Sequence, residues 1–384
     1  MSDAELFAAA MLRHAAVPQI PPDIYLSAKE FALGLEISQK TRIFLDTRYW
    51  LLIRDHVRGN RVDTQIGELL TLLRTLVHDD RAICPVAAPV LGELLKQTDS
   101  ASLALTFELV DDLSASVAIQ PELRRLEIEL RSFLATKLLD GFPAPPLQDL
   151  VWTRPFWITV GVDLDLGYPP DQQEAAEKAF IDLLWECPFS EYAQGLHSWN
   201  DSVPYKDLHD SFPEFTKNEL NIQRSLHPQP PERRSFHTAF MEHLEVALYA
   251  HADEIESVID DWYEGENEIG LRIREGILPE CEKPITEVLR SAFRDAQVGT
   301  ALPYLRILPG ILTAFEFDHS RKVKRNDLAD MYNAASALPY CNIYLTEGSF
   351  QHLLTRKPLQ YDSLYSTQVI SNPAEALDVL MKLL

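Results

Sequence analysis

The chain has 384 residues, of which 46% are apolar and 24% charged, as in an ordinary globular protein with room for two or three structural units. No stretch approaches the roughly 20 apolar residues that a membrane-spanning helix needs, which predicts no membrane association. The early apolar run from Leu6 to Leu12 follows acids instead of a basic region, so it does not resemble a secretion signal. The four cysteines form no CxxC pair, which indicates reduced thiols in a cytoplasmic protein.

The net charge of −23 argues against nucleic-acid binding, because phosphate backbones are held largely by Lys and Arg. The charge is unevenly distributed, however, and its local distribution decides binding. Ten acids and no Lys or Arg lie between Met241 and Glu268, whereas basic residues gather at Arg321, Lys322, Lys324 and Arg325. That basic run is either a solvated loop or a phosphate contact beside the site described below.

The first hundred residues alternate between strand and helix patterns. Short apolar runs predict buried strands at Thr41–Thr47 and Ala82–Val86. Helical periodicity predicts helices at about 48–58 and 64–78, and a third that begins near Pro89. Strands that alternate with helices indicate a parallel sheet.

The middle of the chain is predicted to be helical, with proline-rich loops between the helices. Two amphipathic segments occupy 100–139, and further helices are expected at about 171–185, 236–263, 268–276 and 284–296. The last eighty residues return to an α/β pattern, with helices expected at 327–338, 349–354 and 373–384 and strands at 341–346 and 366–370. We therefore expect one α/β domain formed by residues 1–99 and 305–384, split by a mostly α-helical insertion at 100–304.

Four acids lie where such a sheet would bring them together. Asp46 ends the first strand, Glu93 lies in the helix after the second strand, Asp330 lies near a helix start, and Glu347 follows the later strand. Ligands of open α/β sheets gather outside the carboxyl ends of the strands. Crowded carboxylates need compensation, and two Mg²⁺ or Mn²⁺ ions would supply it while they clamp the attacking and leaving oxygens of a phosphodiester.

Around these acids the chain resembles the PIN-like nuclease family. Asn326–Leu354 resembles the family pattern of an acid that opens a helix, small residues on its inner face, a strand and a final Thr–acid pair. FLDTRYW (Phe44–Trp50) resembles the first metal-binding strand, and CPVAAPVLGELLK (Cys84–Lys96) resembles the segment with the helical glutamate. The chain departs from the pattern at Asn342, where the family often has Asp, and at Glu347, where Asp is commoner.

The resemblance implies a three-layer α/β/α domain with a parallel central sheet. It also implies Mg²⁺- or Mn²⁺-dependent hydrolysis of RNA, or of single-stranded DNA, at Asp46, Glu93, Asp330 and Glu347. Asp327 would assist the metal site or cap its helix, and Arg48 would contact the substrate or pair with an acid. The acidic helical insertion would restrain the nuclease, as suits a toxin or defence effector, or bind a regulatory protein or a second copy of the chain.

Two alternatives stay open. Asp46 could simply cap the following helix, because Asp is a favoured N-cap residue. The whole domain could be a catalytically inactive PIN-like scaffold that serves as a protein-interaction or regulatory module. The P-loop, GxGxxG and GxSxG motifs are absent from the sequence, which disfavours NTPases, dehydrogenases and serine hydrolases.

Overall fold

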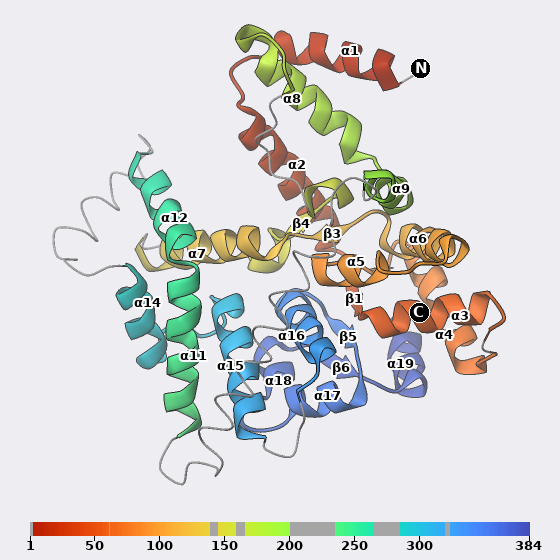
Figure 1. Ribbon diagram of the computed structural model, residues 1–384, viewed down its shortest axis with the longest axis vertical. Helices are drawn as coiled ribbons and strands as arrows, with labels where there is room; N and C mark the ends of the chain where they lie inside the picture. Colours follow the sequence, from red (N-terminus) through yellow and green to blue (C-terminus); the bar gives the residue numbers. More distant parts are fainter. Residues whose placement is uncertain are drawn as a thin grey trace.

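The computed structural model describes residues 3–60, 62–138, 145–158, 166–199, 235–264, 285–318 and 323–384. In these residues the protein is mostly helical, with one parallel sheet of strand order β2-β1-β5-β6 (Figure 1). The strands are β1 (Thr41–Leu45), β2 (Ala82–Ile83), β5 (Ile343–Leu345) and β6 (Gln368–Ile370). The predicted mixed α/β class and the parallel sheet are therefore confirmed.

The central pair of strands is buried on both faces. β1 and β5 are in register from Ile43–Ile343 to Leu45–Leu345, and all six of these residues are at most 3% exposed. Continuous apolar runs are typical of parallel strands that are covered on both sides. Phe44 and Tyr344 face each other across the pair with ring centroids 5.5 Å apart. The pairing joins residues three hundred positions apart and fixes the carboxyl ends of both strands at one edge.

Helices from both ends of the chain surround the sheet. α4 packs against β2 and α19, while α16 packs against α5. The helices of this group are α3 (Thr47–Val57), α4 (Thr64–His78), α5 (Ala88–Leu94), α16 (Arg325–Ala337), α17 (Gly348–Thr355), α18 (Tyr361–Tyr365) and α19 (Pro373–Leu380), with the short η3 (Met381–Leu383) at the end. The first and last parts of the chain thus pack together around the sheet, and the predicted domain boundaries stay a prediction.

Part of the predicted insertion continues the sheet. After α6 (Ser100–Ser114), β3 (Ala118–Ile119) lies beside the segment that follows β2. Val86 forms a parallel bridge with Ala118, and Ile119 N–H donates to Val86 O (2.8 Å). β4 (Trp152–Thr153) then pairs antiparallel with β3. The boundary between the sheet domain and the insertion was predicted between residues 99 and 100 from helical periodicity. Strands of two residues leave no periodic pattern in a sequence, so β3 and β4 were not predicted.

The remaining described helices of the middle region are α7 (Glu122–Leu138), α8 (Pro170–Trp185), α9 (Phe189–Trp199), α11 (Phe236–Ala250), α12 (Ala252–Glu264), α14 (Ile285–Arg294) and α15 (Pro303–Phe317), with 3₁₀ turns η1 (Leu147–Asp149) and η2 (Pro155–Ile158). The helix predicted at 236–263 is two helices that meet at His251. α15 was not predicted. It contains Pro309, and proline normally destabilises a helix when it lies in the interior. The helix predicted at 268–276 lies outside the described residues.

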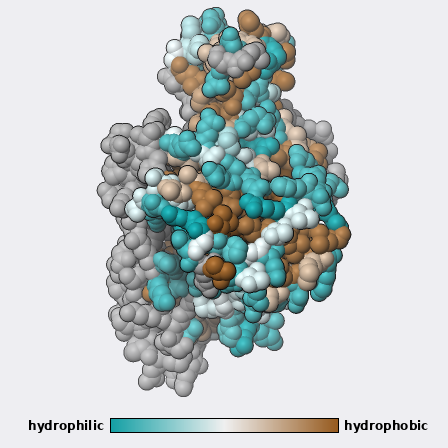
Figure 2. All heavy atoms as spheres, turned by 90° about the vertical axis from the view of Figure 1, so that its right-hand side faces the viewer, coloured by the Kyte–Doolittle hydropathy of each residue, from teal (hydrophilic) through white to brown (hydrophobic). Residues whose placement is uncertain are grey.

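The N-terminal helices α1 (Asp3–Ala15) and α2 (Pro22–Ile37) pack with α8 and form a lobe that projects from the rest (Figures 1 and 2). Asp182 on α8 joins the three helices. Its carboxylate accepts hydrogen bonds from Tyr25 OH (2.6 Å) and Lys29 Nζ (3.0 Å), and His14 Nε2 lies 2.9 Å away. None of the described helices is both long and apolar enough to cross a membrane.

Candidate functional site

Asp46 lies at the carboxyl end of β1 and caps α3. Tyr49 N–H donates to Asp46 Oδ1 (3.3 Å), so the capping role is real. The residue is only 2% exposed, and its second oxygen, Oδ2, is buried without a hydrogen-bond partner. Thr346 lies close enough to lower the pKa of Asp46, but no hydrogen bond of normal geometry reaches Oδ2. A buried carboxylate oxygen with no partner is costly, and one bound cation would satisfy it.

The other three predicted acids approach from separate elements. Glu93, on α5, is partly buried and accepts a hydrogen bond from Thr47 Oγ1. Asp330 lies in the second turn of α16 and is partly buried. Glu347 is exposed and occupies the N-cap position of α17, directly after Thr346. Two strand ends and two helices therefore each contribute one acid.

The charges of these acids act on one another. Burial, and after it the carboxylates of Asp46, Glu347, Glu93 and Asp327 in that order, together raise the pKa of Asp330 to about 8. Burial likewise raises the pKa of Asp46 to about 7, with Glu347 adding to the effect. The pKa of Glu93 is raised by burial and, more weakly, by Glu347. We call Asp46, Glu93, Asp330 and Glu347 the acidic cluster.

Asp327 has a structural role of its own. Its Oδ2 accepts a hydrogen bond from Lys324 N–H (2.7 Å), which caps the start of α16. It is 8% exposed, and its charge contributes to the raised pKa of Asp330. Asp327 therefore caps α16 and adds negative charge beside the acidic cluster, while assistance to a metal site stays a prediction.

The predicted nucleic-acid contacts are described only in part. Arg48 is exposed on the first turn of α3, and its charge lowers the pKa of Asp46. Lys324 is exposed at the N-cap position of α16. Arg325 begins α16, but its side chain lies outside the described residues, as do Arg321 and Lys322. Contacts with a phosphate backbone stay a prediction for all five residues.

Asn342 lies at the opposite end of β5 from the acidic cluster. Its Oδ1 accepts hydrogen bonds from Arg42 N–H (2.9 Å) and Arg42 Nε (3.1 Å), which tie β5 to β1 before the strand begins. An acid at this position would not join the cluster. The departure from the PIN-like pattern at Asn342 therefore removes no carboxylate from the proposed site.

The acidic cluster fits a hard divalent cation in its donor chemistry. All its donors are carboxylate oxygens, which Mg²⁺ and Mn²⁺ prefer, and Asp46 Oδ2 has no other partner. Among the described residues, no group of three or more Asp, Glu, His or Cys side chains is placed so that it could hold a metal ion. Glu93 instead bonds to Thr47 and Asp46 to the backbone of α3, so two of the four acids are turned to protein partners.

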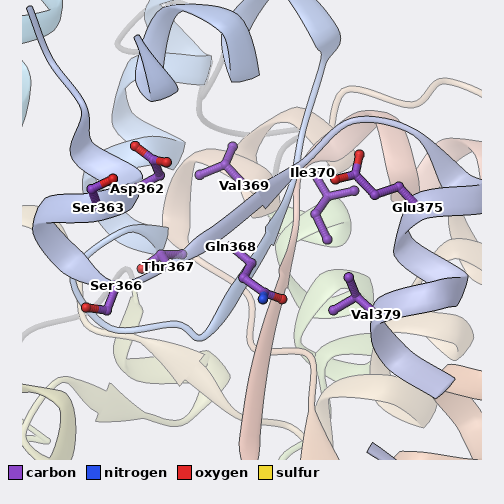
Figure 3. Close-up of a pocket in the computed structure, with 9 residues that line it drawn as sticks. All are labelled: Asp362, Ser363, Ser366, Thr367, Gln368, Val369, Ile370, Glu375 and Val379. Carbon is purple, nitrogen blue, oxygen red and sulfur yellow. The ribbon is translucent and has the colours of Figure 1, made fainter. Parts of the chain in front are cut away.

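A separate pocket of about 380 Å³ lies beside β6 and contains none of these acids (Figure 3). Glu375 and Val379 of α19 line one side, and Asp362, Ser363 and Ser366 line the other. The outward carbonyl of Val369 already accepts a hydrogen bond from Gln351 Nε2 (2.7 Å). This edge of the sheet is therefore partly covered by Gln351.

The sequence prediction missed one residue of this site. The hydroxyl of Tyr344 is buried without a hydrogen-bond partner, and the carboxylates of Asp46, Asp330 and Glu93 act on it. The alternation of β5 could have indicated it, because Tyr344 lies two residues before Thr346 and so on the same face of the sheet. No family model, curated protein or solved structure matches this chain.

Proposed function

We propose that the protein is a metal-dependent nuclease of the PIN-like class, which hydrolyses phosphodiester bonds of RNA in preference to single-stranded DNA. The observation that carries the proposal is the position of Asp330. The pKa of this partly buried carboxylate is raised by burial and by four other carboxylates, two of which, Asp46 and Glu347, follow the carboxyl ends of the parallel strands β1 and β5. Such crowding is unfavourable for stability alone, and perturbed carboxylates of this kind concentrate at functional sites.

In this proposal Asp46, Glu93 and Asp330 hold Mg²⁺ or Mn²⁺, and Glu347 completes the set from the mouth of the site. When bound, the ions stabilise the charge that develops on the phosphate oxygens. Asp46 is the most rigid member, because its cap of α3 fixes Oδ1 and leaves Oδ2 for the ligand. Arg48, exposed two residues later, would hold the phosphate backbone beside it.

A second candidate is an inactive PIN-like scaffold whose helical middle region binds a regulatory protein or a second copy of the chain. The bond between Glu93 and Thr47 favours it, because it directs a carboxylate to a protein partner. The net charge of −23 favours it as well, since it repels nucleic acid outside a local basic patch. The two candidates differ in whether metal ions bind at the acidic cluster.

Replacement of Asp46 by Asn is expected to abolish cleavage of labelled single-stranded RNA in Mn²⁺, with a loss on the order of a thousandfold. Asn caps helices about as well as Asp, so α3 is expected to stay intact in Asp46→Asn. The matched control is Asp63→Asn, which alters the acid that caps α4 through Gln65 and Ile66 and is expected to leave cleavage unchanged.

Equal cleavage by wild type and Asp46→Asn would refute the proposed site. A wild-type protein that neither cleaves RNA or single-stranded DNA nor binds Mn²⁺ in calorimetry would instead support the inactive scaffold. Parallel assays on both nucleic acids also decide the order of substrate preference.

A further inference from the structure

The hydroxyl of Tyr344 lies under the acidic cluster. In-register pairing of β1 and β5 places Phe44 beside Tyr344, and their rings meet edge to face. Side chains two residues apart on a strand share a face, so Asp46 follows Phe44 on the same side as Tyr344. The carboxylates of Asp46, Asp330 and Glu93 all act electrostatically on the phenol. The ring therefore stands on the sheet with its polar end towards the acids.

This hydroxyl is an exception to the usual pairing of buried polar groups. Tyr344 is fully buried, and although the Thr346 side chain acts on its hydroxyl, no hydrogen bond of normal geometry joins the hydroxyl to any described residue. Burial of a hydroxyl without a partner costs roughly 1–3 kcal/mol, so such groups in a protein call for an explanation. Packing alone would be served better by phenylalanine, which fills the same space without this cost.

A second unpaired group lies close by in the fold. Asn333 is one helical turn after Asp330, on the same side of α16, and is fully buried. Neither its Nδ2 nor its Oδ1 has a hydrogen-bond partner. These unpaired groups can donate hydrogen bonds, and the neighbouring carboxylates can accept more than they receive. A carboxylate accepts several hydrogen bonds, and a phenol at neutral pH can donate one.

We propose that Tyr344 is a positioning residue for metal binding: its hydroxyl donates a hydrogen bond to the carboxylate of Asp46 when the acidic cluster holds a divalent cation. This inference rests on the proposed function. Carboxylates that ligate metals are themselves hydrogen-bonded, and these outer partners orient the ligand oxygens towards the ion. Tyr344 is suited to this role because its backbone is fixed by strands on both sides.

The test is Tyr344→Phe, which removes one oxygen and keeps the ring. Calorimetry is expected to show Mn²⁺ binding weakened by about 10- to 100-fold, the usual effect of losing an outer partner of a metal ligand. In EDTA the melting temperature is expected to stay level or rise, since an unpaired hydroxyl is gone. Weaker metal binding without loss of metal-free stability separates positioning from a merely structural role.

The matched control is Tyr365→Phe. Tyr365 is partly buried and its hydroxyl is buried without a partner, but the groups that act on it are Tyr361, Arg306 and Glu129, which are not part of the acidic cluster. The Tyr365→Phe variant is expected to bind Mn²⁺ with the same affinity as the wild type. Wild-type affinity in Tyr344→Phe would overturn this inference alone. Absence of Mn²⁺ binding by the wild type would overturn the proposed function and this inference with it.

Discussion

Replacement of Asp330 by Asn is expected to make the metal-free protein more stable at pH 8 and, at the same time, to abolish cleavage. Asp330 is partly buried among four other carboxylates, which raise its pKa to about 8 together with burial. Removal of this charge relieves the repulsion, and on the order of 2 kcal/mol is expected from shifts of this size in a partly buried group. The loss of a metal ligand is expected to reduce cleavage on the order of a thousandfold or more.

The gain in stability depends on pH with a definite sign. The folded-state pKa of Asp330 is raised above its ordinary value of 3.8, so the protonated form favours folding. The stability that protonated Asp330 contributes to the wild-type protein is fully present below about pH 4 and is lost as the pH rises through about 8. In EDTA the melting temperature of Asp330→Asn should therefore exceed that of wild type by a margin that grows between pH 5 and 8, to about 3 °C.

A charge change outside the cluster provides the control. Asp378→Asn removes an exposed carboxylate of α19 and is expected to change the melting temperature little at any pH. Addition of Mn²⁺ is expected to stabilise wild type and Asp378→Asn but not Asp330→Asn. A margin that stays constant with pH, or Mn²⁺ stabilisation of all three proteins, would contradict the assignment of Asp330.

Much of the sheet unit could be predicted from the sequence because its strands are strongly patterned. The apolar runs before Asp46 and Glu347 mark the two central strands, and acids directly after them mark the carboxyl edge. The convergence of Asp46 and Asp330 follows from that topology, and the raised pKa of Asp330, to which the Asp46 carboxylate contributes, agrees with it. Metal binding there stays a prediction, because no three acidic, His or Cys side chains among the described residues are placed so that they could hold an ion.

Other features were beyond sequence reasoning for physical reasons. β3 has only two residues in its ladder, so it leaves no periodic signal. α15 contains Pro309, and its formation depends on packing in the buried core, which overrides the local preference against proline. The alternation along β5 places Tyr344 on the same face as Thr346, but only the structure shows that the carboxylates of Asp46, Asp330 and Glu93 act on its hydroxyl.

The buried carboxylate of Glu129 on α7 was also not predicted, and it joins the middle region to the helix that carries Asp330. Its Oε1 accepts a hydrogen bond from Tyr340 OH, and its Oε2 accepts one from Tyr304 N–H (2.9 Å) at the start of α15. One turn earlier, the buried Arg125 donates from Nη1 to Ala335 O (2.7 Å) on α16. Glu129 and Arg125 thus hold α7, α15 and α16 together from the inside.

Glu129→Ala is expected to lower the free energy of unfolding by about 3 kcal/mol, because it leaves the buried partners of the carboxylate unpaired. Glu127→Ala is the control on the same helix. It breaks ion pairs with Arg124 and Arg131 that are partly exposed, and a loss of less than about 1 kcal/mol is expected. Urea denaturation measures the free energy of unfolding of both variants. Losses of equal size would show that the buried contacts of Glu129 add no stability beyond that of an exposed ion pair.

Glu129→Gln separates the charge of this residue from its shape. Burial raises the pKa of Glu129 to about 7, against the opposing effects of Tyr340, Tyr304 and Arg125. The stability that the protonated wild-type residue contributes is fully present below about pH 4.5 and is lost as pH rises through about 7. The deficit of Glu129→Gln relative to wild type should therefore be larger at pH 5 than at pH 8. A deficit that grows with pH would mean that the ionised carboxylate, held by Arg125, is the form that ties α7 to α16.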